Sequence, residues 1–282
     1  MGTEDNDGSR PPKSSLLSRS LTIAPESESS GRAGEGELRT AGALSQLPTR
    51  SDEVTIGDVK IPLPVLVSVN GADRLLLPAA HRGLRTYEPD SWQPFLNHVR
   101  PGDTLVDVGA NVGLYAVAAA KRGAHVIAIE PDPANVRQIR RHARLNRVRV
   151  EIVEALAGAQ NSAAPLAARG SPVSGNIDMY LGPTTRYTVA PVLTLDALLK
   201  DEPVDLLKID AEGAEVDVLR GAERTLRDKK PRAILLEVHP PAFALIGQTV
   251  NDLTDLLEAA GYDHEVLWDG DGPERWMAAP RI

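Results

Sequence analysis

A strand, a glycine-containing turn and a helix follow one another between residues 104 and 123, and this unit constrains the fold more than any other part of the sequence. The apolar run Thr104–Val108 predicts a short buried strand, Tyr115–Arg122 predicts a helix, and Gly123 ends that helix. A glycine turn between a parallel strand and a helix presents backbone N–H groups to a ligand. Such turns bind nucleotide-like cofactors at the carboxyl edge of a parallel sheet.

The residues of the turn indicate the kind of cofactor. A dinucleotide fingerprint needs glycine at its first, third and sixth positions, which are Gly109, Asn111 and Leu114 here. Because two of the three glycines are missing, a pyrophosphate cannot approach the turn as closely. The remaining pattern of Asp107, Gly109, Asn111 and Gly113 suits a ligand with a ribose and a zwitterionic amino-acid tail. This description fits S-adenosylmethionine better than NAD, and a turn that only packs helix against strand is the alternative.

Composition excludes several classes of protein. The chain has 282 residues and no cysteine, so disulfides and thiolate metal sites are excluded. A net charge of −8 argues against nucleic-acid binding that depends on neutralising phosphates. No apolar run reaches the roughly 18 residues of a membrane-spanning helix. Residues 1–10 lack the apolar centre of a secretory signal, so we expect a cytoplasmic protein.

The composition changes near residue 50 and divides the chain into three parts. Residues 1–50 are rich in Ser, Gly, Glu, Pro and Arg, and we expect a disordered tail. Residues 51–100 predict a hairpin turning at Asn70–Gly71 and a helix around Trp92–Val99, an extension that serves as a substrate or cofactor lid. Residues 101–282 are expected to form the cofactor-binding domain.

Strands alternate with helices through this domain. After Thr104–Val108, buried strands are predicted at His125–Ile129, Arg149–Val153, Val204–Ile209 and Arg232–Leu236, and two short strands follow around 262–267 and 275–279. The intervening helices are expected at 134–146, 194–199, 215–227 and 250–260. Alternation predicts an α/β fold with a doubly wound, mostly parallel sheet.

Right-handed crossovers place the carboxyl ends of parallel strands at one edge of the sheet. Four of the predicted strands end there in a polar or flexible residue: Gly109, Glu130, Asp210 and Glu237. Packing alone does not explain this coincidence, so we predict a functional crevice at that edge.

Two acids at this edge are candidates for cofactor binding. Glu130 follows Gly109 by about the 20 residues expected of an acid that accepts hydrogen bonds from ribose hydroxyls. Its alternative role is a favourable charge at a helix N-terminus. Asp107 precedes the turn, where it either accepts from loop amides or faces the ammonium group of the cofactor.

The catalytic candidates are Asp210, Glu237 and His239. Asp210 lies at the centre of the edge, where it is expected both to bind the cofactor and to orient an acceptor hydroxyl or take its proton. Lys208 is its expected ion-pair partner. His239 is the natural general base near neutral pH. A divalent cation held by Asp210, Glu237 and His239 is an alternative, but no ligand spacing marks it, so no metal is assigned.

Two further charged features can be explained by structural roles. Glu212 and Glu215 are interpreted either as site residues or as caps at the start of a helix. Four arginines fall at i, i+3, i+4 and i+7 on the basic helix, which favours a solvated face over a nucleic-acid patch: Arg137, Arg140, Arg141 and Arg144.

With these residues in place, the chain resembles the FkbM-type family of S-adenosylmethionine-dependent methyltransferases over roughly residues 80–240. The matching blocks are Val106–Gly113, Ile129–Pro133 and Asp205–Ala222, and the Lys-Ile-Asp-x-Glu-Gly-x-Glu pattern at 208–215 is the specific part. The resemblance implies a class I methyltransferase (Rossmann-like) fold with an antiparallel C-terminal strand. It also implies O-methylation of a small molecule, sugar or natural product.

The resemblance also assigns cofactor-binding residues. Gly109, Asn111 and Gly113 would line the methionine part, Glu130 would bind the ribose, and Asp132 stands in the same block. Tyr87 and Glu88 would close over the cofactor. Ala155 and Leu156 would lie near the adenine, although Gly158-Ala159-Gln160 replaces the acid that family members often carry there.

Three other functions remain open at this point. One is a nicotinamide-dependent oxidoreductase, and a second is a catalytically silent cofactor- or partner-binding module. A third is N-methylation of a nucleic acid, which is disfavoured by the negative net charge and by the absence of an Asn/Asp-Pro-Pro-aromatic block after the fourth strand. The expected partner is a small-molecule or glycan acceptor, with neither nucleic acid nor membrane, and a homo-oligomer is left open.

Overall fold

This computed structural model describes residues 88–167, 187–200, 202–270 and 272–282, together with four short strands between residues 53 and 75. The four strands form two antiparallel hairpins: β1 (Glu53–Ile56) with β2 (Val59–Pro62), and β3 (Leu66–Val69) with β4 (Ala72–Leu75). The predicted tail at 1–50, the turn at 70–71 and Tyr87 lie outside the described residues. The predicted boundaries at residues 50 and 100 stay predictions.

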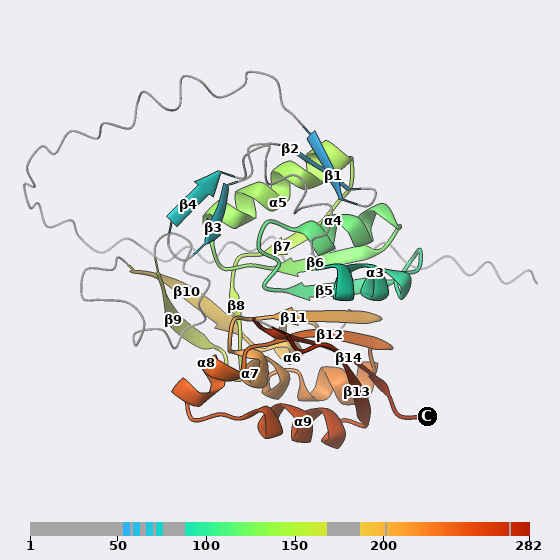
Figure 1. The fold of residues 1–282 in the computed structure, drawn as a ribbon, viewed down its shortest axis with the longest axis vertical. Coiled ribbons are helices and arrows are strands. Elements are labelled where there is room, and N and C mark those ends of the chain that lie inside the picture. The colour runs from blue at the N-terminus through green and yellow to red at the C-terminus, as the bar shows by residue number, and fades with distance from the viewer. Residues whose placement is uncertain are drawn as a thin grey trace, which may run out of the picture. The chain divides into compact units, whose positions relative to one another are not determined.

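A seven-stranded sheet forms the centre of the described unit (Figure 1). Its strands, in spatial order, are β13 (Tyr262–Trp268), β14 (Glu274–Pro280), β12 (Ala233–Val238), β11 (Leu206–Asp210), β5 (Thr104–Val108), β6 (His125–Ile129) and β7 (Glu151–Val153). The five strands from β12 to β7 are parallel, and β14 is antiparallel to both of its neighbours. The predicted doubly wound sheet with an antiparallel C-terminal strand is confirmed.

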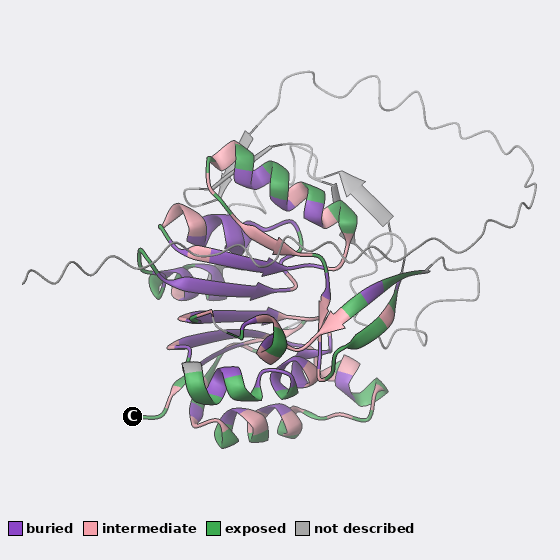
Figure 2. Cartoon of the chain, turned by 180° about the vertical axis from the view of Figure 1, so that it is seen from behind, coloured by how far each residue is buried: buried purple, intermediate pink, exposed green. Residues whose placement is uncertain are grey.

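Helices cover both faces of this sheet. On one face lie α3 (Pro89–Asn97), α4 (Leu114–Lys121) and α5 (Pro133–Asn146). On the other lie α6 (Leu195–Leu198), α7 (Glu215–Arg220), α8 (Pro240–Leu245) and α9 (Val250–Ala259). Because each parallel strand is covered twice, β5, β6 and β12 carry apolar side chains into two separate cores. Figure 2 shows the central strands buried and the outer helix faces exposed.

The order of the strands reverses between β5 and β11. The chain runs outward from β5 through β6 to β7, and then returns to build β11 and β12 on the opposite side of β5. In open α/β sheets, ligands bind in the crevice beyond the carboxyl ends of the strands where this reversal occurs. The topology therefore points to the ends of β5 and β11, which carry Gly109 and Asp210.

A smaller sheet follows β7. It contains β8 (Leu156–Ala157), β10 (Tyr187–Leu193) and β9 (Ser162–Ala167), with β10 in the middle. β9 pairs antiparallel with β10, and β8 pairs parallel with it.

Two helices differ from their predictions. The helix expected over 215–227 ends at Arg220, and a π-helical turn at Thr225–Lys229 follows it. The Asp196 side chain accepts hydrogen bonds from the backbone amides of Arg224 (2.8 Å) and Thr225 (2.7 Å), which ends the regular pattern. Helix α8 was not predicted, and it begins with Pro240 and Pro241, which the first turn of a helix tolerates. Within the described ranges, no helix has both the length and the apolar character needed to cross a membrane.

Candidate active site

The turn after β5 is built from backbone conformations that favour glycine. Gly109 has φ +69° and Gly113 has φ +83°, and Asn111 between them is also left-handed, with φ +51°. A Cβ atom on Gly109 would lie 1.8 Å from the backbone oxygen of Asp210. Only glycine therefore permits the ends of β5 and β11 to approach so closely. The predicted meeting of Gly109 and Asp210 at one edge is confirmed.

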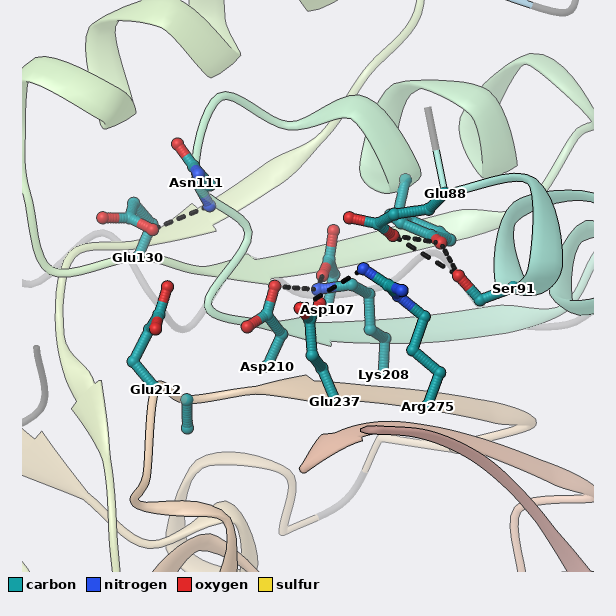
Figure 3. A network of polar contacts seen from close by, with 12 residues as sticks. Glu88, Ser91, Asp107, Asn111, Glu130, Lys208, Asp210, Glu212, Glu237 and Arg275 are labelled. Carbon is teal, nitrogen blue, oxygen red and sulfur yellow. Dashed lines mark hydrogen bonds and ion pairs between the residues drawn. The ribbon is translucent and has the colours of Figure 1, made fainter. Parts of the chain in front are cut away.

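Glu130, at the end of β6, holds the turn from the side. Its Oε2 atom accepts from the Asn111 amide at 2.8 Å, and its Oε1 atom accepts from the Asp132 amide at 2.9 Å and from Asn135 Nδ2 at 3.2 Å. Burial raises the pKa of Glu130 to about 7, although these hydrogen bonds oppose the shift. A carboxylate has about four acceptor positions, so three donors leave room for a hydroxyl. Figure 3 shows Glu130 directed at the turn.

A buried lysine lies below the turn. Lys208 Nζ is 3.1 Å from Asp210 Oδ2 and 3.6 Å from Asp107 Oδ1, and it lies 5.2 Å from the centre of the Tyr115 ring. Burial disfavours the ammonium, but the carboxylates of Asp210 and Asp107 raise the pKa of Lys208 above its ordinary value. Burial also raises the pKa of Asp107 to about 6, although the charge of Lys208 opposes the shift. The predicted pairing of Lys208 with Asp210 is confirmed.

Glu88 reaches the site from the start of α3. The Tyr115 hydroxyl donates to Glu88 Oε2 at 2.7 Å, and Ser91 Oγ lies 3.0 Å from the same hydroxyl. Glu88 has a left-handed backbone, with φ +40°. These contacts fix a carboxylate beside the buried lysine, where the resemblance expects a residue that covers the cofactor (Figure 3).

Glu237, the penultimate residue of β12, lies directly beside Asp210 in the parallel register. Its Oε1 atom is 3.6 Å from Arg275 Nη2 on β14, and the Arg275 guanidinium lies over the Trp268 ring at 5.2 Å. Burial raises the pKa of Glu237 to about 8, and the charges of Asp210 and Glu88 add to the shift. Figure 3 shows Asp210 paired with Lys208 and, beside them, Glu237 paired with Arg275.

His239 lies in a second group of acids, at the start of α8. Its Nδ1 atom is 2.9 Å from Glu215 Oε1, and its Nε2 atom is 3.3 Å from Glu212 Oε2. Burial disfavours the imidazolium, but the hydrogen bond to Glu215 and the charges of Glu215, Glu212 and Asp210 raise the pKa of His239 to about 9. His239 as it stands is therefore mainly protonated at neutral pH, whereas a general base must be neutral. Its predicted catalytic role stays a prediction.

Asp132, Ala155 and Leu156 lie along the β6 and β7 side of the site. The Asp132 carboxylate caps α5 by accepting from the Ala134 amide at 2.7 Å, so its backbone amide, rather than its charge, faces Glu130. Ala155 is buried directly after β7, and Leu156 begins β8. The four arginines of α5 are exposed, as predicted for a solvated face.

The structure adds residues that the sequence analysis did not assign. Tyr115 and Arg275 both contact predicted site acids, and Trp268 supports Arg275. The sequence signal that could have identified Tyr115 as a site residue was its position two residues after Gly113. Glu215, for which a capping role was weighed, accepts from the amides of Ala211 (3.1 Å) and Gly213 (2.9 Å) and also holds His239.

A family profile described as "Methyltransferase FkbM domain" matches residues 107–263, more than half of the chain and all of the site except Glu88, Ser91, Trp268 and Arg275. The chain belongs to the FkbM methyltransferase family. S-adenosylmethionine is its cofactor, and the nicotinamide alternative is thereby replaced.

Individual relatives match over limited parts. The chain is 27% identical over 308 aligned residues to the AMB antimetabolite synthetase AmbE of Pseudomonas aeruginosa, covering 86% of this chain but 14% of that protein. It is 29% identical over 106 residues to the ribosomal protein L11 methyltransferase of Thermus thermophilus, covering 37% of this chain and 42% of that protein. The solved magnesium protoporphyrin IX methyltransferase of Synechocystis is 13% identical, with a TM-score of 0.46 over 74% of this chain and 87% of that one.

The described residues fit this cofactor. Six carboxyl side chains and three basic ones meet at the site: Glu88, Asp107, Asp210, Glu212, Glu215 and Glu237 against Lys208, His239 and Arg275. An excess of negative charge suits the sulfonium and ammonium groups of S-adenosylmethionine. Glu130 keeps an acceptor position for a ribose hydroxyl, as described above.

Proposed function

We propose that this methyltransferase transfers the methyl group to a hydroxyl oxygen of a small molecule, sugar or natural product. The observation that carries the proposal is the pair of carboxylates Asp210 and Glu237. They lie side by side near the ends of the neighbouring strands β11 and β12, and Asp210 is next to the glycine turn, where the strand order reverses. A hydroxyl has to be oriented and must lose a proton, and carboxylates can do both.

The charge of the site supports a small acceptor over a nucleic acid. The acidic groups gathered here repel phosphates, and the arginines of α5 lie on an exposed helix face. AmbE, matched over most of this chain, is an antimetabolite synthetase, which supports an acceptor from natural-product chemistry. The relatives that act on tRNA or a ribosomal protein match over at most 37% of the chain. The proposal includes a cytoplasmic reaction and no membrane partner.

Each side chain has a distinct role in this proposal. Gly109, Asn111, Gly113 and Glu130 hold the cofactor through the turn and its ribose. When bound, S-adenosylmethionine supplies an electrophilic methyl group on a sulfonium. Asp210, fixed by Lys208, accepts a hydrogen bond from the acceptor hydroxyl and thereby orients its oxygen.

Glu237, held in place by Arg275, takes the proton of that hydroxyl in its deprotonated form, and because its pKa is about 8 this form increases as the pH rises above neutral. Among the three predicted catalytic residues, Glu237 has this role because it lies beside Asp210, whereas His239 is engaged by two glutamates. The remaining excess of carboxylates lowers the affinity for an anionic acceptor.

Transfer of a labelled methyl group tests the proposal. The full chain is incubated with labelled S-adenosylmethionine and a panel of matched compounds that carry a hydroxyl, an amine or a thiol. Label in the hydroxyl compounds, lost at least tenfold in E237Q and D210N while calorimetry shows unchanged cofactor binding, is the expected result. Transfer only to nitrogen or sulfur contradicts O-methylation. Cofactor binding without transfer to any member favours the silent module.

A further inference from the structure

Three side chains with metal-ligating atoms meet beside the proposed acceptor position. Asp210 ends β11, Glu212 lies in the turn that follows, and His239 follows β12. One ligand atom from each lies within 4.8 Å of the other two. Two carboxylates and an imidazole, drawn from two adjacent strand ends, therefore face a common point.

We propose that Asp210, Glu212 and His239 bind a divalent cation of the Mg²⁺ or Mn²⁺ class. The inference that this cation holds the acceptor hydroxyl rests on the proposed function, whereas cation binding itself does not. The sequence alone suggested Glu237 as the second carboxylate of such a set. In the structure Glu237 pairs with Arg275 instead, and Glu212 takes its place beside His239.

The imidazole of His239 is oriented as a metal ligand. Histidines that bind metals almost always donate their second ring N–H to a carboxylate or carbonyl, which fixes the tautomer and the direction of the ring. Glu215 Oε1 lies 2.9 Å from His239 Nδ1 and leaves Nε2 directed at Glu212. The Glu215 side chain is fully buried and is itself held by the amides of Ala211 and Gly213.

The polar atoms of this group are incompletely matched without a cation. Glu215 Oε2 is buried and has no hydrogen-bond partner among the described residues. Glu212 and Glu215 contact opposite nitrogens of the His239 ring at 3.3 and 2.9 Å, so two carboxylates share one imidazole. A divalent ion between Asp210, Glu212 and Nε2 neutralises the carboxylates that His239 cannot.

The ligand set selects the class of ion. Two carboxylate oxygens and one imidazole suit hard or borderline cations such as Mg²⁺ and Mn²⁺, and the chain contains no cysteine thiolate that would favour softer ions. An octahedral ion with three protein ligands keeps about three positions for water and substrate oxygens. A hydroxyl bound there becomes more acidic, so the proton passes more readily to Glu237.

Direct titration of Mn²⁺ tests the site. Free Mn²⁺ is followed by its electron paramagnetic resonance signal in the presence of the full chain, without S-adenosylmethionine. We expect one saturable site, with an affinity at least tenfold weaker in E212Q and H239A. E215Q leaves all three ligands in place and is expected to weaken binding about 10- to 100-fold through loss of orientation. E265Q, a change at an exposed carboxylate of β13, is the matched control and keeps the wild-type affinity.

Two outcomes of the Mn²⁺ titration would exclude the proposed metal site. Absence of saturable Mn²⁺ binding up to ~1 mM, or an unchanged affinity in E212Q, is incompatible with it. Glu212 decides the test because its side chain is 42% exposed and its replacement leaves the core intact, even if D210N or H239A does not fold. If Mn²⁺ binds as expected but no methyl group is transferred, the site stands and the proposed function fails. If methyl transfer persists undiminished after chelation and no Mn²⁺ binds, the proposed function stands and the metal site fails.

Discussion

Replacement of Gly109 by alanine tests the close approach of β5 to β11. The backbone of Gly109 is left-handed, at φ +69°, where an ordinary residue costs about 1–2 kcal/mol. The new Cβ would also lie 1.8 Å from the Asp210 backbone oxygen, so the turn and the end of β11 must move apart by more than an ångström. Overpacking of this kind costs about 1–3 kcal/mol. We therefore expect G109A to lose about 2–5 kcal/mol of unfolding free energy.

Gly102 provides the matched control. It is also left-handed, at φ +88°, but a Cβ atom there meets nothing within 4 Å. G102A should therefore lose only the backbone contribution of about 1–2 kcal/mol. Both variants are compared with the wild type by urea unfolding, with the slope of the transition checked for constancy. Calorimetry should show weaker S-adenosylmethionine binding in G109A alone. Equal destabilisation of the two variants would refute the steric argument.

Three further predictions address pH, a cap and a buried hydroxyl. Because the folded state raises the Glu130 pKa from 4.5 to about 7, folded protein retains a proton that the unfolded chain releases. Stability should therefore fall between pH 5 and 8 by up to ~3 kcal/mol more in the wild type than in E130Q, measured by urea unfolding; parallel profiles would contradict this. Thr249 forms a capping box with Asp252 at the start of α9, so T249A should lose about 1 kcal/mol and T249S nearly none in thermal unfolding. Y115F removes a buried donor to Glu88 and should lose about 1–3 kcal/mol, and a loss below 0.5 kcal/mol would show that the hydrogen bond is unimportant.

The parallel strands could be predicted from the sequence because the apolar runs and the residues that follow them indicate the same strand boundaries. The strands β5 and β6 begin and end where predicted, since each is an apolar run closed by glycine or a charged residue. Their carboxyl ends share one edge by the handedness of the crossovers, so the meeting of Gly109, Glu130 and Asp210 was predictable without coordinates.

The remaining features depend on contacts between distant segments. The π-helical turn at Thr225–Lys229 depends on Asp196, which precedes it by about 30 residues. The pairing of Glu237 with Arg275 depends on the antiparallel register of β12 and β14, which no local pattern encodes. The side on which His239 meets Glu212 likewise follows from a turn conformation, since Glu212 is left-handed, at φ +51°. Glu237 and His239, both catalytic candidates from the sequence, have different partners in the structure.

The position of β14 bears on how the domain reaches its native state during synthesis. Residues 274–280 insert between β12 and β13, although both of those strands are made earlier. Until this segment leaves the ribosome, β12 remains an open edge, with unpaired amides and carbonyls that favour pairing with other chains. A nascent chain halted before residue 274 would therefore be prone to aggregate, and Arg275 would reach Glu237 only as the sheet closes.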